Sequence, residues 1–251
     1  MEKNIKSELW DIAWCIQDIA DGGWRKEHPP LPVEKVIYSE HSVTASDNGE
    51  EVSSRNSAHD ISEGTVSVDI ITSDILECKK CRLASGRIQA VPGIAIKGLP
   101  VLVVGEAPGA DEDRMGEPFV GKAGKYLDKW LAAIGLERKK DVNILNVVKC
   151  RPPNNRDPLP DEIEACIPYL KAQISLLKPV VILTLGRFAT SVLTGSEEGI
   201  TKIRGKIYKY DGIPLVPTFH PSAVLRNQTL KRPVWEDLKL LKMILNKQLK
   251  G

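Results

Sequence analysis

The segment VLVVGEAPGADEDRMGEPFVGKAGKYL, residues 101–127, decides the fold of this protein. It begins with a short apolar run, Val101–Gly105, and a helical pattern follows from about Lys122 to Ile134. A strand without alternating polar residues is buried on both faces, so helices must cover both sides of its sheet. The segment therefore predicts the first unit of an α/β fold.

The same alternation of strand and helix continues along the chain. Further strands are expected at residues 142–148 and 180–186, and helices at residues 161–177, 187–195 and 234–248. Asp211-Gly212 stands between two apolar runs and is typical of a two-residue hairpin turn. These patterns indicate a largely parallel sheet that is covered by helices on both faces.

Charge is distributed unevenly over the 251 residues, although the net charge is only +2. Residues 1–75 contain 6 Lys and Arg against 15 Asp and Glu, whereas the remainder contains 29 against 18. A basic body favours DNA or another phosphate-bearing partner. No apolar run approaches the roughly 18 residues of a membrane span, and no signal peptide is evident. We therefore expect an intracellular protein without a membrane partner.

Composition divides the chain into three parts. Residues 1–38 contain apolar side chains at helical spacing, which predicts an N-terminal helix that packs on its own core or binds a partner. Residues 39–73 are rich in Ser, Asn, Gly and acidic residues and contain no aromatic residue, which predicts a flexible acidic linker. Residues 74–251 form the expected catalytic domain. A protein partner for residues 1–73 is a further expectation.

Ligands of open parallel sheets bind beyond the carboxyl ends of the strands, so the loops after Gly105, Val148 and Phe219 are the expected site. The first loop is rich in glycine, which permits close approach of backbone to a ligand. Its residues 116–123 approach a phosphate-loop pattern. Ala123 lacks the hydroxyl that holds Mg²⁺ and Pro118 lacks an N–H, so we reject nucleotide hydrolysis.

The other two loops carry polar side chains suited to recognition. Asn146 ends a predicted strand, where its amide can read a base edge or only cap the strand. His220 follows the last predicted strand and is expected at the mouth of the same cleft. Contacts to phosphate are expected from a set of basic residues near these loops: Lys149, Arg151, Arg156 and Arg226.

Four cysteines suggest a metal centre. Cys78 and Cys81 form a C-x₂-C pair, and Cys150 and Cys166 come from two later segments. Four thiolates can hold either Zn²⁺ or an iron–sulfur cluster, and spacing does not choose between them. The fifth cysteine, Cys15, is expected to be a small apolar side chain of the N-terminal helix.

Taken together, residues 74–247 resemble the family 4 uracil-DNA glycosylases. The resemblance rests on Cys78-x-x-Cys81, GEAPGADEDRMGEPFVGKAG, NVVKCRPPNNRDP, Cys166 and HPSAVLRN, in that order. It implies a three-layer α/β/α fold around a central four-stranded, mainly parallel sheet. It also implies hydrolytic removal of uracil from DNA during base excision repair, by an enzyme that contains a [4Fe-4S] cluster on Cys78, Cys81, Cys150 and Cys166. We further expect the protein to be a monomer.

The resemblance also suggests roles for individual residues. Asn146 would read the uracil edge, Phe119 would stack on the base, and His220 would stabilise the charge on the departing uracil. Glu106 or a backbone carbonyl would position the water, because Ala107 stands where some relatives have Asp. The remaining substrate contacts are expected from Gly105, Ala107, Gly109, Arg226 and a wedge residue, Leu225.

Two other functions compete with this interpretation. A non-catalytic module would bind uracil or DNA ends and be tethered to a replication or repair partner by the acidic leader. A zinc-dependent nuclease is disfavoured, because the chain has only 4 His and no carboxylate–histidine cluster.

Overall fold

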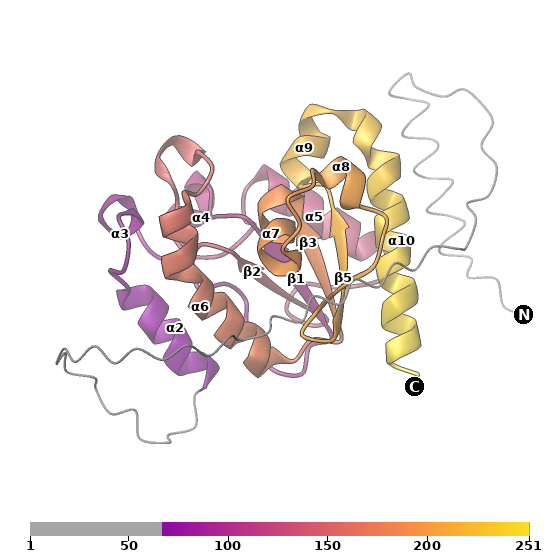
Figure 1. The fold of residues 1–251 in the computed structure, drawn as a ribbon, viewed down its shortest axis with the longest axis horizontal. Coiled ribbons are helices and arrows are strands. Elements are labelled where there is room, and N and C mark those ends of the chain that lie inside the picture. Colours follow the sequence, from indigo (N-terminus) through magenta and orange to yellow (C-terminus); the bar gives the residue numbers. More distant parts are fainter. Residues whose placement is uncertain (1–66, 251) are drawn as a thin grey trace, which may run out of the picture.

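The computed structural model of the protein describes residues 67–250 (Figure 1). The predicted N-terminal helix, nearly all of the predicted linker and Cys15 lie outside the described residues. The described part begins with helix α2, Val68–Glu77, which starts before the domain boundary that we expected at residue 74.

The centre of the fold is a five-stranded sheet with the order β2-β1-β3-β5-β4. Its strands are β1 (Val101–Gly105), β2 (Val142–Asn146), β3 (Val181–Leu185), β4 (Tyr208–Tyr210) and β5 (Ile213–Thr218). The pairs β1–β2, β1–β3 and β3–β5 are parallel, and β4 pairs antiparallel with β5. The predicted fold class is confirmed. The sheet has one strand more than expected, because β4 of the predicted hairpin joins its edge.

Helices cover the two faces of the sheet, and short helices follow the carboxyl ends of its parallel strands. The remaining helices are α3 (Leu83–Gly86), α4 (Ala110–Met115), α5 (Lys122–Ala133), α6 (Pro160–Leu177), α7 (Gly186–Thr194), α8 (Ile200–Ile203), α9 (Pro221–Arg226) and α10 (Lys231–Gln248). Short 3₁₀ turns occupy Pro153–Asn155 and Gln228–Leu230. The long helices α5, α6, α7 and α10 confirm the predicted helical patterns to within a few residues.

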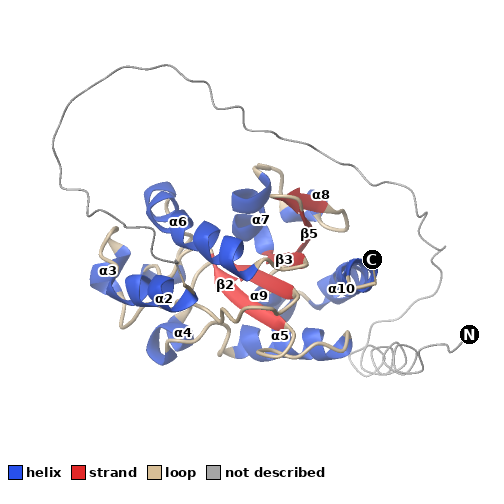
Figure 2. Cartoon of the chain, turned by 90° about the horizontal axis from the view of Figure 1, so that it is seen from below, coloured by secondary structure: helices blue, strands red, loops and turns tan. Residues whose placement is uncertain are grey.

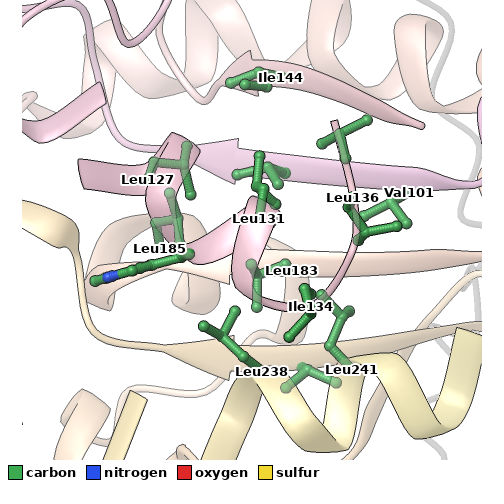
Figure 3. Close-up of a cluster of buried hydrophobic side chains, with 14 of the residues drawn as sticks. Val101, Leu127, Leu131, Ile134, Leu136, Ile144, Leu183, Leu185, Leu238 and Leu241 are labelled. Carbon is green, nitrogen blue, oxygen red and sulfur yellow. The ribbon is translucent and has the colours of Figure 1, made fainter. Parts of the chain in front are cut away.

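Successive side chains of the strands point to opposite faces of the sheet and pack into two separate hydrophobic cores. On one face, Val101, Ile144 and Leu183 pack against Leu131 of α5 and Leu238 of α10 (Figure 3). On the other face, a second cluster joins the strands to α2, α6 and α7. Figure 2 shows α6 and α7 on one side of the strands and α5 on the other. Burial on both faces explains why β1, β2, β3 and β5 consist mainly of apolar residues.

Parallel register brings the chemistry-bearing loops to one edge of the sheet. Gly105 of β1 pairs with Asn146 of β2, and Leu185 of β3 pairs with Thr218 of β5. Because all four strands point the same way, the loops that follow them meet above their carboxyl ends. Between residues 67 and 250, no helix combines the length and the apolar composition that crossing a bilayer requires.

Candidate active site

A cleft of about 560 Å³ opens where these loops meet. The residues that line it include most of the predicted site: Glu106, Ala107, Gly109, Phe119, Asn146, His220 and Arg226. Gly105 lies directly behind the cleft against Asn146 and Phe119. Leu225 is outside the lining, on the exposed end of α9, where its side chain is 41% exposed. The fold therefore assembles the predicted residues from three separate loops.

Asn146 supplies a buried polar group that lacks a partner. The residue ends β2 and is 2% exposed, and its side-chain Oδ1 accepts no hydrogen bond within the described residues. An unsatisfied buried acceptor costs about 1–3 kcal/mol. Asn146 lines a ligand-sized cleft, so the N–H of a ligand bound there is the partner that would satisfy Oδ1.

Phe119 forms an aromatic wall beside this amide. Its backbone has a φ of 54°, and Arg138 holds that conformation by donating to the carbonyl oxygens of Pro118 at 2.7 Å and Phe119 at 2.9 Å. A Cβ at Gly105 would lie 2.6 Å from Cζ of Phe119 and would also collide with Oδ1 of Asn146. Glycine is therefore required at position 105 for the ring and the amide to approach each other.

Glu112 organises the first loop, and sequence reasoning missed it. Its carboxylate accepts from the backbone N–H groups of Gly109 at 3.0 Å, Val120 at 3.0 Å and Gly121 at 3.1 Å. It thereby ties the turn after β1 to the Phe119 segment. The available signal was a glutamate three residues after Gly109, the spacing of a capping box at the start of α4.

His220 faces the cleft as a neutral imidazole. It is the N-cap of α9, and its Nδ1 accepts the backbone N–H of Ser222 at 3.2 Å. The proton must then reside on Nε2, which is free to donate. Burial and the nearby Arg226 guanidinium lower the pKa of His220 to about 4. The ring centroids of His220 and Phe119 are 5.6 Å apart.

A buried ion pair supports the strand that carries His220. Asp237 of α10 is fully buried, and Arg204 donates to its two carboxylate oxygens at 2.9 and 2.7 Å. The hydroxyl of Thr218, two residues before His220, donates to the same carboxylate at 2.6 Å. These hydrogen bonds attach the C-terminal end of β5 to α10. No local pattern in the sequence indicated them.

Glu106 has the most perturbed carboxyl group of the cleft. Burial, reinforced by the neighbouring Asp157 charge, raises its pKa to about 7, and Arg187 opposes this shift. Arg187 lies 3.3 Å from Asp157. A carboxyl group that titrates near neutrality can exchange a proton or orient a water molecule at working pH.

The structure rules out the predicted phosphate contact of Lys149, and it shows that Arg156 is bound to a buried carboxylate. Lys149 is 1% exposed, so the prediction that it contacts phosphate at the surface is wrong. Arg156 lines the cleft, but its guanidinium is bound at 2.8 and 2.6 Å to Glu162, which is fully buried. Arg151 donates to Asn155 at 2.7 Å, and Arg226 is exposed at the end of α9.

The four predicted cysteines lie around a second cavity. Cys78, Cys81, Cys150 and Cys166 line it together with Arg87, Lys80 and Lys149. Arg87 donates to Sγ of Cys150 at 2.9 Å, and the backbone N–H of Lys149 donates to Sγ of Cys166 at 3.3 Å. Over residues 67–250, no three His, Cys, Asp or Glu side chains converge on a single metal-ion position.

The sequence was also compared with known protein families and proteins. Residues 92–239 match the model of the uracil DNA glycosylase superfamily. The chain is 47% identical over 185 residues to the type-4 uracil-DNA glycosylase of Sulfurisphaera tokodaii, covering 70% of this chain and 84% of that protein. It is 42% identical over 190 residues to the type-4 enzyme of Archaeoglobus fulgidus, covering 72% and 95%. The type-5 enzyme of Thermus thermophilus is 35% identical, over 41% of this chain and 53% of that protein.

Proposed function

The chain belongs to the uracil-DNA glycosylase superfamily, and from this membership we propose that it hydrolyses the N-glycosidic bond of uracil in DNA. It is a type-4 enzyme that excises uracil during DNA repair and leaves an abasic site. The observation that carries the site assignment is the unpaired Oδ1 of Asn146 beside Phe119 and neutral His220. We further propose that it acts as a monomer inside the cell.

Asn146 reads the base through two hydrogen bonds. Its unpaired Oδ1 accepts the N3–H of uracil, and its amide NH₂ donates to uracil O4. Cytosine presents an acceptor at N3 and an amine at C4, so both bonds fail. Because a site built around hydrogen bonds leaves buried atoms unpaired with the wrong base, discrimination is strong.

His220 stabilises the leaving group. When the bond between C1′ and N1 breaks, its electron pair remains on uracil and negative charge develops on O2. The Nε2–H of His220 donates to O2, and one such donor is worth about 2.7–4 kcal/mol. Uracil leaves as its anion, and water adds to C1′ and releases its proton to the solvent. Glu106 or a backbone carbonyl of the Gly105–Gly109 turn orients that water.

DNA binding exposes the base to this pocket. Extrusion of the nucleotide costs a few kcal/mol, which stacking on Phe119 and phosphate contacts offset. Arg226 is placed to contact phosphate at the cleft, and Leu225 beside it is the proposed wedge that fills the vacated stack. Gly109 and Ala107 leave room for the base against the backbone.

The cysteine cavity fits a [4Fe-4S] cluster. Four thiols surround one cavity, and basic groups of Arg87, Lys80 and Lys149 oppose the negative charge that four thiolates bring. Such a cluster would serve as a structural staple between α2, the loop after β2 and α6. A brown protein that absorbs near 400 nm is expected, and a colourless zinc protein would contradict this assignment.

The activity test uses a strand with a single uracil, followed by hot alkali. Cleavage of U·G, U·A or single-stranded substrates is expected, and binding without base release would favour the non-catalytic module instead. N146A and H220A should lose activity by orders of magnitude while folding normally. The exposed variant K247Q, on the last turn of α10, is the matched control. A protein partner for residues 1–73 remains a prediction outside the described residues.

A further inference from the structure

Lys149 places an ammonium group in the protein interior. Its side chain is 1% exposed, and Nζ donates at 2.9 Å to the main-chain carbonyl oxygen of Asn146. Within the described residues, this carbonyl is the one hydrogen-bond acceptor that Nζ has. An ammonium carries three donors, and a buried positive charge is stable only where negative charge compensates it.

The compensating charge comes from the cysteine cavity. Lys149 lines that cavity together with Cys150 and Cys166, and its backbone N–H donates to Sγ of Cys166 at 3.3 Å. Thiols are neutral, whereas thiolates bound to iron are negative. A loaded cavity therefore attracts the ammonium, and an empty one leaves the buried charge without compensation.

The other end of the contact belongs to the uracil site. The carbonyl that accepts from Lys149 belongs to Asn146, whose side-chain Oδ1 is the unpaired acceptor in the cleft. A shift of this peptide group moves the reading amide with it. We propose that Lys149 is a positioning residue that couples occupancy of the cysteine cavity to uracil recognition by Asn146. This inference rests on the proposed cluster and on the proposed function of Asn146.

The other cations of the cavity do not make this connection. Arg87 donates to Cys150 and to the carbonyl of Leu76, on the side of α2. Lys80 is exposed, and its Nζ lies 4.7 Å from the centroid of the Tyr169 ring. Neither contacts Asn146. Lys80 is therefore a matched control, because K80M removes a positive charge from the same cavity and leaves the reading amide untouched.

The experiment compares the full-length wild type, K149M and K80M. Iron and sulfide content and the absorbance near 400 nm report cluster loading, and the reduction potential reports the charge beside it. Uracil recognition is measured as the affinity ratio between strands that contain a non-hydrolysable 2′-fluoro-deoxyuridine and strands that contain cytosine in its place. In K149M we expect a more negative potential and a ratio about 10- to 100-fold lower. K80M should keep the wild-type ratio.

Equal affinity ratios in K149M and K80M would overturn the inference. If circular dichroism shows that K149M does not fold, K149Q replaces it in the test, because glutamine retains a hydrogen-bond donor and lacks the charge. K149Q should show the more negative potential and a partly reduced ratio; a wild-type potential together with a wild-type ratio would count against the coupling. Uracil release and brown colour in the wild type test the proposed function separately, so the two failures are distinguishable.

Discussion

At the scale of single residues, the cleft keeps two titratable groups in protonation states that differ from those of exposed side chains. His220 is neutral because burial and Arg226 disfavour a second positive charge, and Ser222 assigns its proton to Nε2. Glu106 holds its proton up to about pH 7 because burial and Asp157 disfavour its charge. The neutral His220 prepares the site for negative charge on the departing uracil, because its Nε2–H donor is in place.

The titration of Glu106 predicts the pH dependence of turnover. If its carboxylate orients the water, the rate of uracil release should rise between about pH 6 and pH 8, because the pKa of Glu106 is about 7. E106Q should lower the rate and remove this limb of the profile. Single-turnover rates of uracil release, measured from pH 6 to pH 8, test this prediction. A limb that persists in E106Q would show that another group titrates in this range and that the Glu106 carboxylate does not orient the water.

The raised pKa of Glu106 also makes the stability of the protein depend on pH. The folded pKa of about 7 lies above the reference value of 4.5, so the folded state binds the proton more tightly. The stability contributed by Glu106 is present below about pH 4.5 and is lost as the pH rises to about 7. Wild type should therefore lose more stability than E106Q between pH 5 and pH 8. Thermal unfolding at the two pH values tests this independently of activity.

At the scale of the element, the turn after β1 depends on a position without a side chain. In G105A the added Cβ would collide with Oδ1 of Asn146 and crowd the Phe119 ring, so the reading amide must move. A displacement of about 1 Å in a catalytic site can cost about 100-fold in rate. We expect a loss of this size. G86A is the control, because a Cβ at Gly86 meets nothing within 4 Å. Similar activity in both variants would contradict the packing argument.

The ion pair beneath β5 predicts a loss of stability. D237N leaves the partly buried Arg204 without its negative partner, which costs about 3–5 kcal/mol when a buried pair is broken. The unfolding temperature should fall by several degrees. E236Q, at the neighbouring position of α10, should change it little, because its ion pair with Lys239 is 3.3 Å long and solvent-accessible. Equal unfolding temperatures would argue against the supporting role of Asp237.

Several elements of the fold could be predicted because their signals are local. The run Val101–Gly105 is apolar throughout, and Val181–Leu185 has Thr184 as its one polar residue, as expected of strands covered on both faces. Asp211-Gly212, between two apolar runs, marked the hairpin of β4 and β5. The helix α9 spans only six residues, which is too short for a helical period to emerge.

The site could be predicted in part, and the missing part depends on distant contacts. Asn146 and His220 were identifiable because Asn146 ends one strand and His220 follows another at the same sheet edge. The pairing of Arg204 with Asp237 joins residues 33 positions apart, which no local pattern encodes. Lys149 was misassigned because a lysine in a basic loop resembles a surface residue, whereas the cysteine cavity buries it.

At the scale of the whole molecule, the excess of basic residues after residue 75 predicts salt-dependent binding to DNA. Each phosphate that a cation neutralises contributes about −0.9 to the slope of log affinity against log salt. Arg226 is exposed at the cleft, and the described residues record no ion pair for it. We expect R226Q to make this slope shallower by about 0.9 for duplexes with or without uracil. K247Q, far along α10 from the cleft, should keep the wild-type slope. If R226Q kept it as well, DNA would have to approach the molecule by another face.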